Sequence, residues 1–162
     1  MQKNTEHIPN RDDVSTAILQ HLDGLRGIDT HCHHLPDDQF QNMGVKFLYD
    51  HSYCNWMDDL LGLLHSYSNG YADLCWLPLI STSAAKRFLR EALEIGGSNR
   101  ILWGCDTWTS EESYGAVLAF RRVVSEVLSE MCQEGYLSCE EACYTAGQIW
   151  RGNALKLFGF ED

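Results

Sequence analysis

Short apolar runs alternate with amphipathic segments along this chain, and this alternation constrains the fold more than any other feature. Three runs have the length and apolar character of short buried strands, at residues 27–33, 72–77 and 100–105. The second run should stop at Pro78, because proline lacks the N–H that a sheet ladder requires. Helical spacings precede, separate and follow the three runs. The sequence therefore predicts an α/β fold, with all 162 residues in one domain.

The helices are predicted from apolar spacing and from capping residues at their ends. Ser81 or Ser83 should begin the helix that ends at Gly96, and Ser138 with Glu141 forms a capping-box pattern. Asp and Ser residues near position 12 can cap the first helix, and Gly159 should end the last one. The predicted helices cover residues 12–25, 60–64, 85–96, 114–131, 141–149 and 153–158.

Composition excludes several classes of function. The chain carries 23 acidic and 12 basic residues, so its formal charge of -11 repels phosphate backbones and argues against a nucleic-acid partner. No apolar run approaches the roughly 20 residues that cross a bilayer, and the polar start does not resemble a signal peptide. We therefore expect a cytoplasmic protein without a membrane partner.

The cysteines do not form a recognisable metal or disulfide pattern. There are seven of them, widely spread and without a C-x-x-C pair. We expect reduced thiols, most of them buried. Cys105 is treated as a core residue, and Cys139 with Cys143, one helical turn apart, as helix packing.

Two histidines mark the polar end of the first apolar run. In a strand, alternate side chains face the same way, so His31 and His33 should project together. Two imidazoles on one face can chelate a divalent metal, provided that further ligands come from elsewhere in the fold. The alternative is an ordinary pair of surface or core histidines.

Asp106 ends the third apolar run. A carboxylate at this end of a parallel strand can bind a metal or take a proton from metal-bound water. The alternative is a structural role, because residues 106–111 also have the character of a helix entry. The combination with His31 and His33 favours the functional interpretation. Trp108, just after Asp106, is the tryptophan best placed to line a pocket.

These residues together resemble the metal-dependent amidohydrolase superfamily. Asp29, His31 and His33 resemble its first-strand D-x-H-x-H signature, and residues 101–106 resemble its final strand. The tail at 149–159 resembles the closing helix of the decarboxylase-like and lactonase-like branch. Residues 47–53 with Trp56, and residues 76–81, are similar to uronate-isomerase-like members.

The resemblance implies a (β/α)₈ barrel with a divalent metal, zinc being the expected ion. His31 and His33 would be metal ligands, and Asp106 both a ligand and a proton shuttle. Hydrolysis, lactone opening and nonoxidative decarboxylation all occur in this superfamily, so the expected substrate is a small carboxylated or lactone-like molecule. Mechanistically, metal-activated water would attack while Asp106 accepts its proton.

The length departs from the family pattern. Such barrels need about 250 residues, and only the first and last strand regions are recognisable, with 72–77 as a possible penultimate strand. We therefore predict a partial or shortened TIM-type (β/α) barrel, with an internal deletion near residues 57–60. The competing hypothesis is a noncatalytic remnant of the fold that survives by self-association, since an open sheet edge favours a homo-oligomer.

Overall fold

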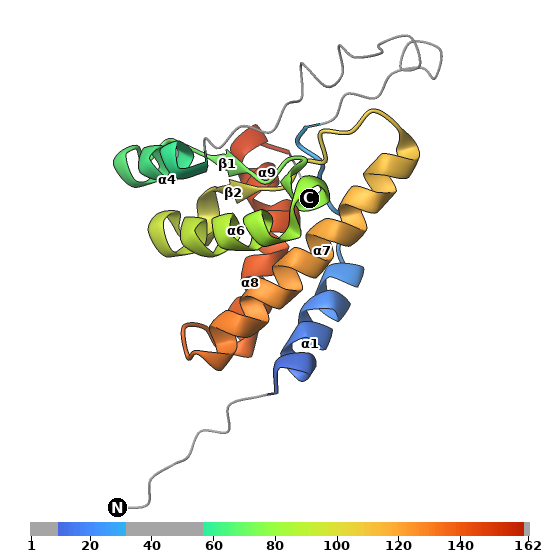
Figure 1. Cartoon of the computed structure of the whole chain (residues 1–162), viewed down its shortest axis with the longest axis vertical. Coiled ribbons are helices and arrows are strands. Elements are labelled where there is room, and N and C mark those ends of the chain that lie inside the picture. Colours follow the sequence, from blue (N-terminus) through green and yellow to red (C-terminus); the bar gives the residue numbers. More distant parts are fainter. Residues whose placement is uncertain (1–9, 32–56, 161–162) are drawn as a thin grey trace, which may run out of the picture.

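The structure, a computed structural model, describes residues 10–31 and 57–160. Figure 1 labels the helices and strands in this part of the chain. In chain order they are α1 (Arg11–Asp23), α4 (Met57–Ser66), β1 (Ala72–Asp73), α5 (Leu77–Ile80), α6 (Thr82–Gly96), the 3₁₀ turn η1 (Ser98–Arg100), β2 (Ile101–Leu102), α7 (Ser110–Gln133), α8 (Cys139–Gly147), the π-helical turn η2 (Gln148–Gly152) and α9 (Asn153–Phe158).

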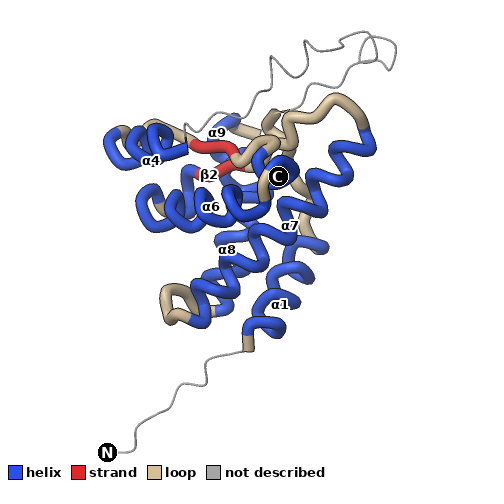
Figure 2. The backbone as a smooth tube through the Cα atoms, in the orientation of Figure 1, coloured by secondary structure: helices blue, strands red, loops and turns tan. Residues whose placement is uncertain are grey.

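The two short strands pair in parallel. Ala72 lies opposite Ile101 and Asp73 opposite Leu102, which is the arrangement expected of strands joined by a crossover helix. Helix α6 supplies that crossover, so the predicted order of strand, helix and strand is confirmed. In Figure 2 the strands form a small piece beside α6 and α9, and helices make up most of the drawn chain.

Residues 30 and 31 lie beside the chain that follows β2. The backbone N–H of Thr30 donates to the carbonyl of Trp103 at 3.1 Å, and the N–H of Asp106 donates to the carbonyl of His31 at 2.6 Å. The bonded positions rise together along both segments, so the two run in the same direction. Residues 30 and 31, the chain after β1 and the chain after β2 therefore lie close together.

The helices pack around a long central helix. Helix α7 contacts α1, α8, α6 and α5, and α6 also contacts α4. Figure 1 shows α1 beside α7 over much of its length. Three aromatic side chains fill the core beneath the strands, with ring centroids 4.6 Å apart for Trp103 and Trp150, and 5.4 Å apart for Phe120 and Trp150. This core supports the segment that carries Asp106.

Most helix ends follow the predicted capping chemistry. The Ser81 side chain accepts the N–H of Ala84, and Ser138 with Glu141 forms the full capping box. Gly159 ends α9 in the left-handed conformation with φ of 68°. One prediction is wrong: Asn10 rather than an Asp or Ser residue caps α1, its side chain accepting from the N–H of Asp12.

The strands are shorter than predicted. The carboxylate of Asp73 accepts the N–H of Cys75 at 2.7 Å, and this local bond turns the chain out of the ladder after β1. Pro78 then lies in the first turn of α5, where its missing N–H costs nothing. The third run begins as the turn η1, so β2 keeps only Ile101–Leu102.

The described residues contain an α/β arrangement without a closed barrel. Their sheet has two strands, and residues 57–60 form the first turn of α4. No helix within 10–31 and 57–160 combines the length and apolar character needed to cross a membrane. Five cysteines in these ranges are free thiols; Cys105 and Cys132 are buried and the other three are half-buried, so the prediction that most are buried is wrong for this part of the chain.

An ion pair between α6 and α7 leads to a pH-dependent prediction. The Glu126 carboxylate contacts the ammonium of Lys86 and lies 2.9 Å from Nε of Arg122, and these two partners lower the pKa of Glu126 below 4.5. The pair therefore stabilises the fold above pH 4.5, and this contribution is lost as pH falls through the lower, folded-state pKa.

Glu126→Gln should lower the free energy of unfolding by about 0.5–1 kcal/mol at neutral pH. Urea unfolding at a series of pH values should show the difference from the wild type disappearing in acid. Adding Lys86→Gln to this variant should lower the free energy of unfolding only slightly further, because the ion pair between Lys86 and Glu126 is already lost. A deficit of the same size at every pH would contradict the ion-pair explanation.

Candidate metal centre

Three side chains with metal-binding atoms converge where the apolar runs end. His31 lies near the end of the first apolar run, Cys75 follows β1, and Asp106 follows β2. One donor atom from each lies within 4.8 Å of the other two. The three residues come from distant parts of the chain. The segments that carry them run in the same direction, so the three side chains come to lie on one side of the fold. Sites in parallel α/β folds lie at this carboxyl end of the strands.

The imidazole of His31 lies between the other two donors. Its Nδ1 is 3.3 Å from Sγ of Cys75, and its Nε2 is 3.4 Å from Oδ1 of Asp106. The His31 side chain is 42% exposed, whereas that of Asp106 is 16% exposed. The histidine side chain is therefore partly open to solvent, while the carboxylate is largely enclosed by the fold.

Both residues that follow the strands have an unusual backbone. Asp106 has φ of 49° and Cys75 has φ of 43°, and among the described residues these are the non-glycine positions with positive φ. This left-handed conformation is disfavoured for residues with a Cβ, and such strain concentrates at functional sites. Here it directs a carboxylate and a thiol toward one histidine.

Asp29 joins the segment that ends at His31 to the chain that follows β2. Its Oδ1 accepts the N–H of His31 at 3.1 Å and the N–H of Cys105 at 3.0 Å. Its Oδ2 accepts the thiol of Cys105 at 2.6 Å. The carboxylate thus fixes the backbone of His31 against the segment that carries Asp106.

Asp73 likewise joins the chain after β1, which carries Cys75, to the segment that carries His31. Its Oδ1 accepts the N–H of Cys75, and its Oδ2 accepts the hydroxyl of Thr30. Gly104 is required beside it, because a Cβ there would lie 2.7 Å from Asp73 Oδ2 and 2.7 Å from the Cβ of His31. A side chain at position 104 would therefore push the segments apart.

The two nearby thiols are held in their protonated form in the absence of a metal. Burial raises the pKa of Cys75, and the charges of Asp73 and Asp106 raise it further. Burial and the bond to Asp29 raise the pKa of Cys105 to about 11. Cys105 lies in the core and also contacts Thr107 at 3.0 Å, so it has no features of an activated nucleophile.

The structure brings His31 and Asp106 together, as the sequence predicts. His33 lies outside the described residues. The alternative of Asp106 as a helix cap is wrong, because Thr109 caps α7 in a capping box with Glu112. Trp108 is 8% exposed, and its predicted role in lining a pocket stays a prediction.

Sequence reasoning missed Cys75, Asp73 and the bridging role of Asp29. A signal for Cys75 was present, because it comes at the end of a predicted strand, where parallel strands present their side chains to a shared site. Nothing local distinguishes it from an ordinary core cysteine. Only the pairing of β1 with β2 places it beside His31.

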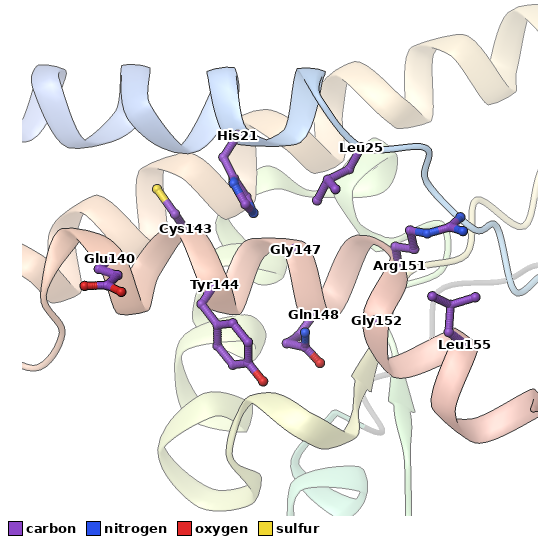
Figure 3. A pocket seen from close by; sticks show the side chains of 10 residues that line it. All are labelled: His21, Leu25, Glu140, Cys143, Tyr144, Gly147, Gln148, Arg151, Gly152 and Leu155. Carbon is purple, nitrogen blue, oxygen red and sulfur yellow. The ribbon is translucent and has the colours of Figure 1, made fainter. Parts of the chain in front are cut away.

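A separate cavity lies between the end of α1 and the helices α8, η2 and α9. Figure 3 shows its lining side chains, which come from α1, α8, η2 and α9 and from Leu25 just after α1. It has a volume of about 480 Å³ and is lined by His21, Tyr144, Gln148 and Arg151, among others. None of the converging residues His31, Cys75 and Asp106 lines it.

Comparison with known families identifies the chain. The model of a family described as Amidohydrolase matches residues 38–160. The chain belongs to the amidohydrolase family. Amidohydrolases are metal-dependent hydrolases that generally use divalent ions, which agrees with the donor atoms gathered here. The match begins after His31, so this histidine and the D-x-H-x-H pattern lie outside the matched range.

One curated relative agrees with this assignment. The chain is 33% identical over 98 residues to Protein fluG from Emericella nidulans, a match that covers 59% of this amidohydrolase chain. The matched part is 11% of the length of Protein fluG. No solved structure matches the chain.

The residues present fit a divalent metal of the kind that the family uses. A nitrogen, a sulfur and an oxygen donor form a mixed set that suits zinc. Donor atoms in a tetrahedral zinc site lie about 3.3–3.8 Å apart, given Zn–N near 2.0 Å and Zn–S near 2.3 Å. One ion binds one nitrogen of His31, so either the contact of Nδ1 with Cys75 at 3.3 Å or that of Nε2 with Asp106 at 3.4 Å has this spacing. With one donor atom taken from each residue, the three atoms lie within 4.8 Å of one another.

Proposed function

We propose that this amidohydrolase is a metal-dependent hydrolase or lyase that acts on a small carboxylated or lactone-like substrate. The observation that carries the proposal is the convergence of His31 and Asp106, with their side chains 3.4 Å apart, in a chain that the family model matches. Fold membership alone does not establish an activity, whereas a site with the right donor atoms supports one.

The metal ligands in this proposal are His31, His33 and Asp106. A bound divalent ion would polarise the carbonyl or carboxylate of the substrate and make bound water acidic enough to act as a nucleophile at neutral pH. His31 is fixed for this role by its backbone bonds to Asp29 and Asp106, which hold the first segment in place.

Asp106 is the proposed proton acceptor. Its backbone is held by the 2.6 Å bond to the carbonyl of His31, and its carboxylate is largely enclosed. A carboxylate in this position accepts the proton of the attacking water and returns it to the leaving group. The same enclosure reduces the contact of the carboxylate with bulk water, which would strengthen its interaction with charge that develops nearby.

We further propose that the fold is a partial (β/α) barrel. The segment that ends at His31 lies beside the chain after β2, and β2 pairs with β1. In a barrel these three segments would belong to the first, last and penultimate strands, and here they are neighbours. This contact supports a substrate site at the carboxyl end of the strands, where barrels of this type have theirs. The deletion near residues 57–60 belongs to the same proposal.

The first experiment measures bound zinc per chain in purified protein. Wild type should carry close to one ion, and the His31→Ala, His33→Ala double variant should lose nearly all of it, because two of the proposed ligands are gone. Asp106→Asn should keep part of the metal and lose turnover in a screen of small lactones and carboxylates. Circular dichroism verifies that each variant is folded.

His65→Ala is the matched control. This histidine is exposed in the last turn of α4 and is not part of the converging cluster, so its loss should leave the metal content unchanged. Metal that persists in the double variant would contradict the site. A folded wild type without metal would favour the noncatalytic remnant, and light scattering would then show whether it self-associates.

A further inference from the structure

We infer that Cys75 is a ligand of this metal centre, and that its thiolate makes the centre selective for zinc over magnesium and manganese. The inference rests on the proposed function, because it concerns the same ion. It adds a sulfur donor from the segment after β1 to the histidine and aspartate ligands.

The contacts of Cys75 carry the inference. Its Sγ lies 3.3 Å from Nδ1 of His31 and within 4.8 Å of a carboxylate oxygen of Asp106. One nitrogen of His31, the thiol and one carboxylate oxygen thus already lie close enough to face a common space. The other described cysteines are not part of this cluster.

The surrounding residues fix the position of the thiol. The Asp73 carboxylate holds the N–H of Cys75 at 2.7 Å and also accepts the hydroxyl of Thr30, so it ties the residue to the histidine segment. Both carboxylate oxygens of Asp73 are engaged in this way, which makes Asp73 a positioning residue rather than a ligand. Supporting contacts of this kind orient the ligands of metal sites.

The chemistry of binding is a simple exchange. The S–H bond of Cys75 breaks, its proton leaves to solvent, and a sulfur–metal bond forms without any change of oxidation state. The resulting thiolate and the carboxylate of Asp106 together balance the two positive charges of the ion. Thiolate favours zinc, cobalt(II) and cadmium, whereas magnesium and manganese prefer oxygen donors.

The test uses cobalt(II) as a spectroscopic substitute for zinc in the full chain. Metal-free wild type titrated with cobalt(II) should develop a near-ultraviolet sulfur-to-cobalt charge-transfer band. Cys75→Ser should lose the band and bind zinc at least about tenfold more weakly, as expected when a donor of the site is lost. Cys143→Ser removes a half-buried thiol that lines the separate cavity and should behave like wild type.

Cadmium NMR of the unmutated protein gives the same information without relying on a folded variant, because a sulfur donor shifts the cadmium signal strongly downfield. Cobalt that binds wild type without the charge-transfer band, or zinc affinity unchanged in folded Cys75→Ser, would overturn the role of Cys75 and leave the proposed function intact. Absence of binding by cobalt, cadmium and zinc would overturn both.

Discussion

Replacing Phe120 by alanine is expected to lower the free energy of unfolding by about 3–5 kcal/mol, a large share of what holds a domain of this size together. Phe120 is fully buried on α7 and stacks on Trp150 with ring centroids 5.4 Å apart. It also lies 5.5 Å from Trp103, one residue before Gly104. The substitution would leave a cavity between two rings that cannot both move to fill it. Urea unfolding followed by tryptophan fluorescence measures the loss.

Leu118→Ala is the matched control on the same helix. Leu118 is 52% exposed, so its truncation removes little buried surface and should change the free energy of unfolding by no more than about 0.5 kcal/mol. Equal effects of the two substitutions would mean that the aromatic residues do not form the core described here.

The helices were predictable because their signals are local. A capping residue and an apolar stripe lie within a few turns of each other, so the start of α8 at Ser138 and Glu141 and the end of α9 at Gly159 could be identified without knowledge of the rest of the fold. The cap of α1 was missed because Asn10 competes with the neighbouring Asp12 and Asp13, which have similar capping chemistry.

The strand lengths were not predictable in the same way. An apolar run indicates burial, but a ladder also needs a partner strand, and that partner lies far away in the sequence. The run that begins at Ala72 was read as a strand to residue 77, whereas the side chain of Asp73 ends the ladder by binding the N–H of Cys75. This competition between side chain and backbone is invisible in the apolar pattern.

The site was predicted to the extent that strand ends reveal it. His31 and Asp106 were identified because each is a polar residue that closes an apolar run, and the family resemblance implied that the two runs are neighbours. Cys75 was missed because a cysteine after an apolar run normally belongs to the core. Its role depends on the register of β1 against β2, which a single sequence does not encode locally.

Gly104→Ala is expected to remove the metal site and to destabilise the fold by about 1–3 kcal/mol. The added Cβ would lie 2.7 Å from Asp73 Oδ2 and from the Cβ of His31, and 2.8 Å from the backbone nitrogen of His31. Because the last contact is with backbone, a side-chain rotation cannot relieve it. The first segment must move away from the segment that carries Asp106. Zinc content and urea unfolding measure the two effects separately.

Gly62→Ala separates this clash from the general effect of adding a methyl group. Gly62 lies inside α4 with no atom within 4 Å of the new Cβ, so the substitution should stabilise the protein by about 0.5–1 kcal/mol through helix propensity. Zinc content should remain at the wild-type level. If Gly104→Ala kept its zinc and its stability, the close approach of His31 and Asp73 to residue 104 would be refuted, because that approach leaves no space for a Cβ.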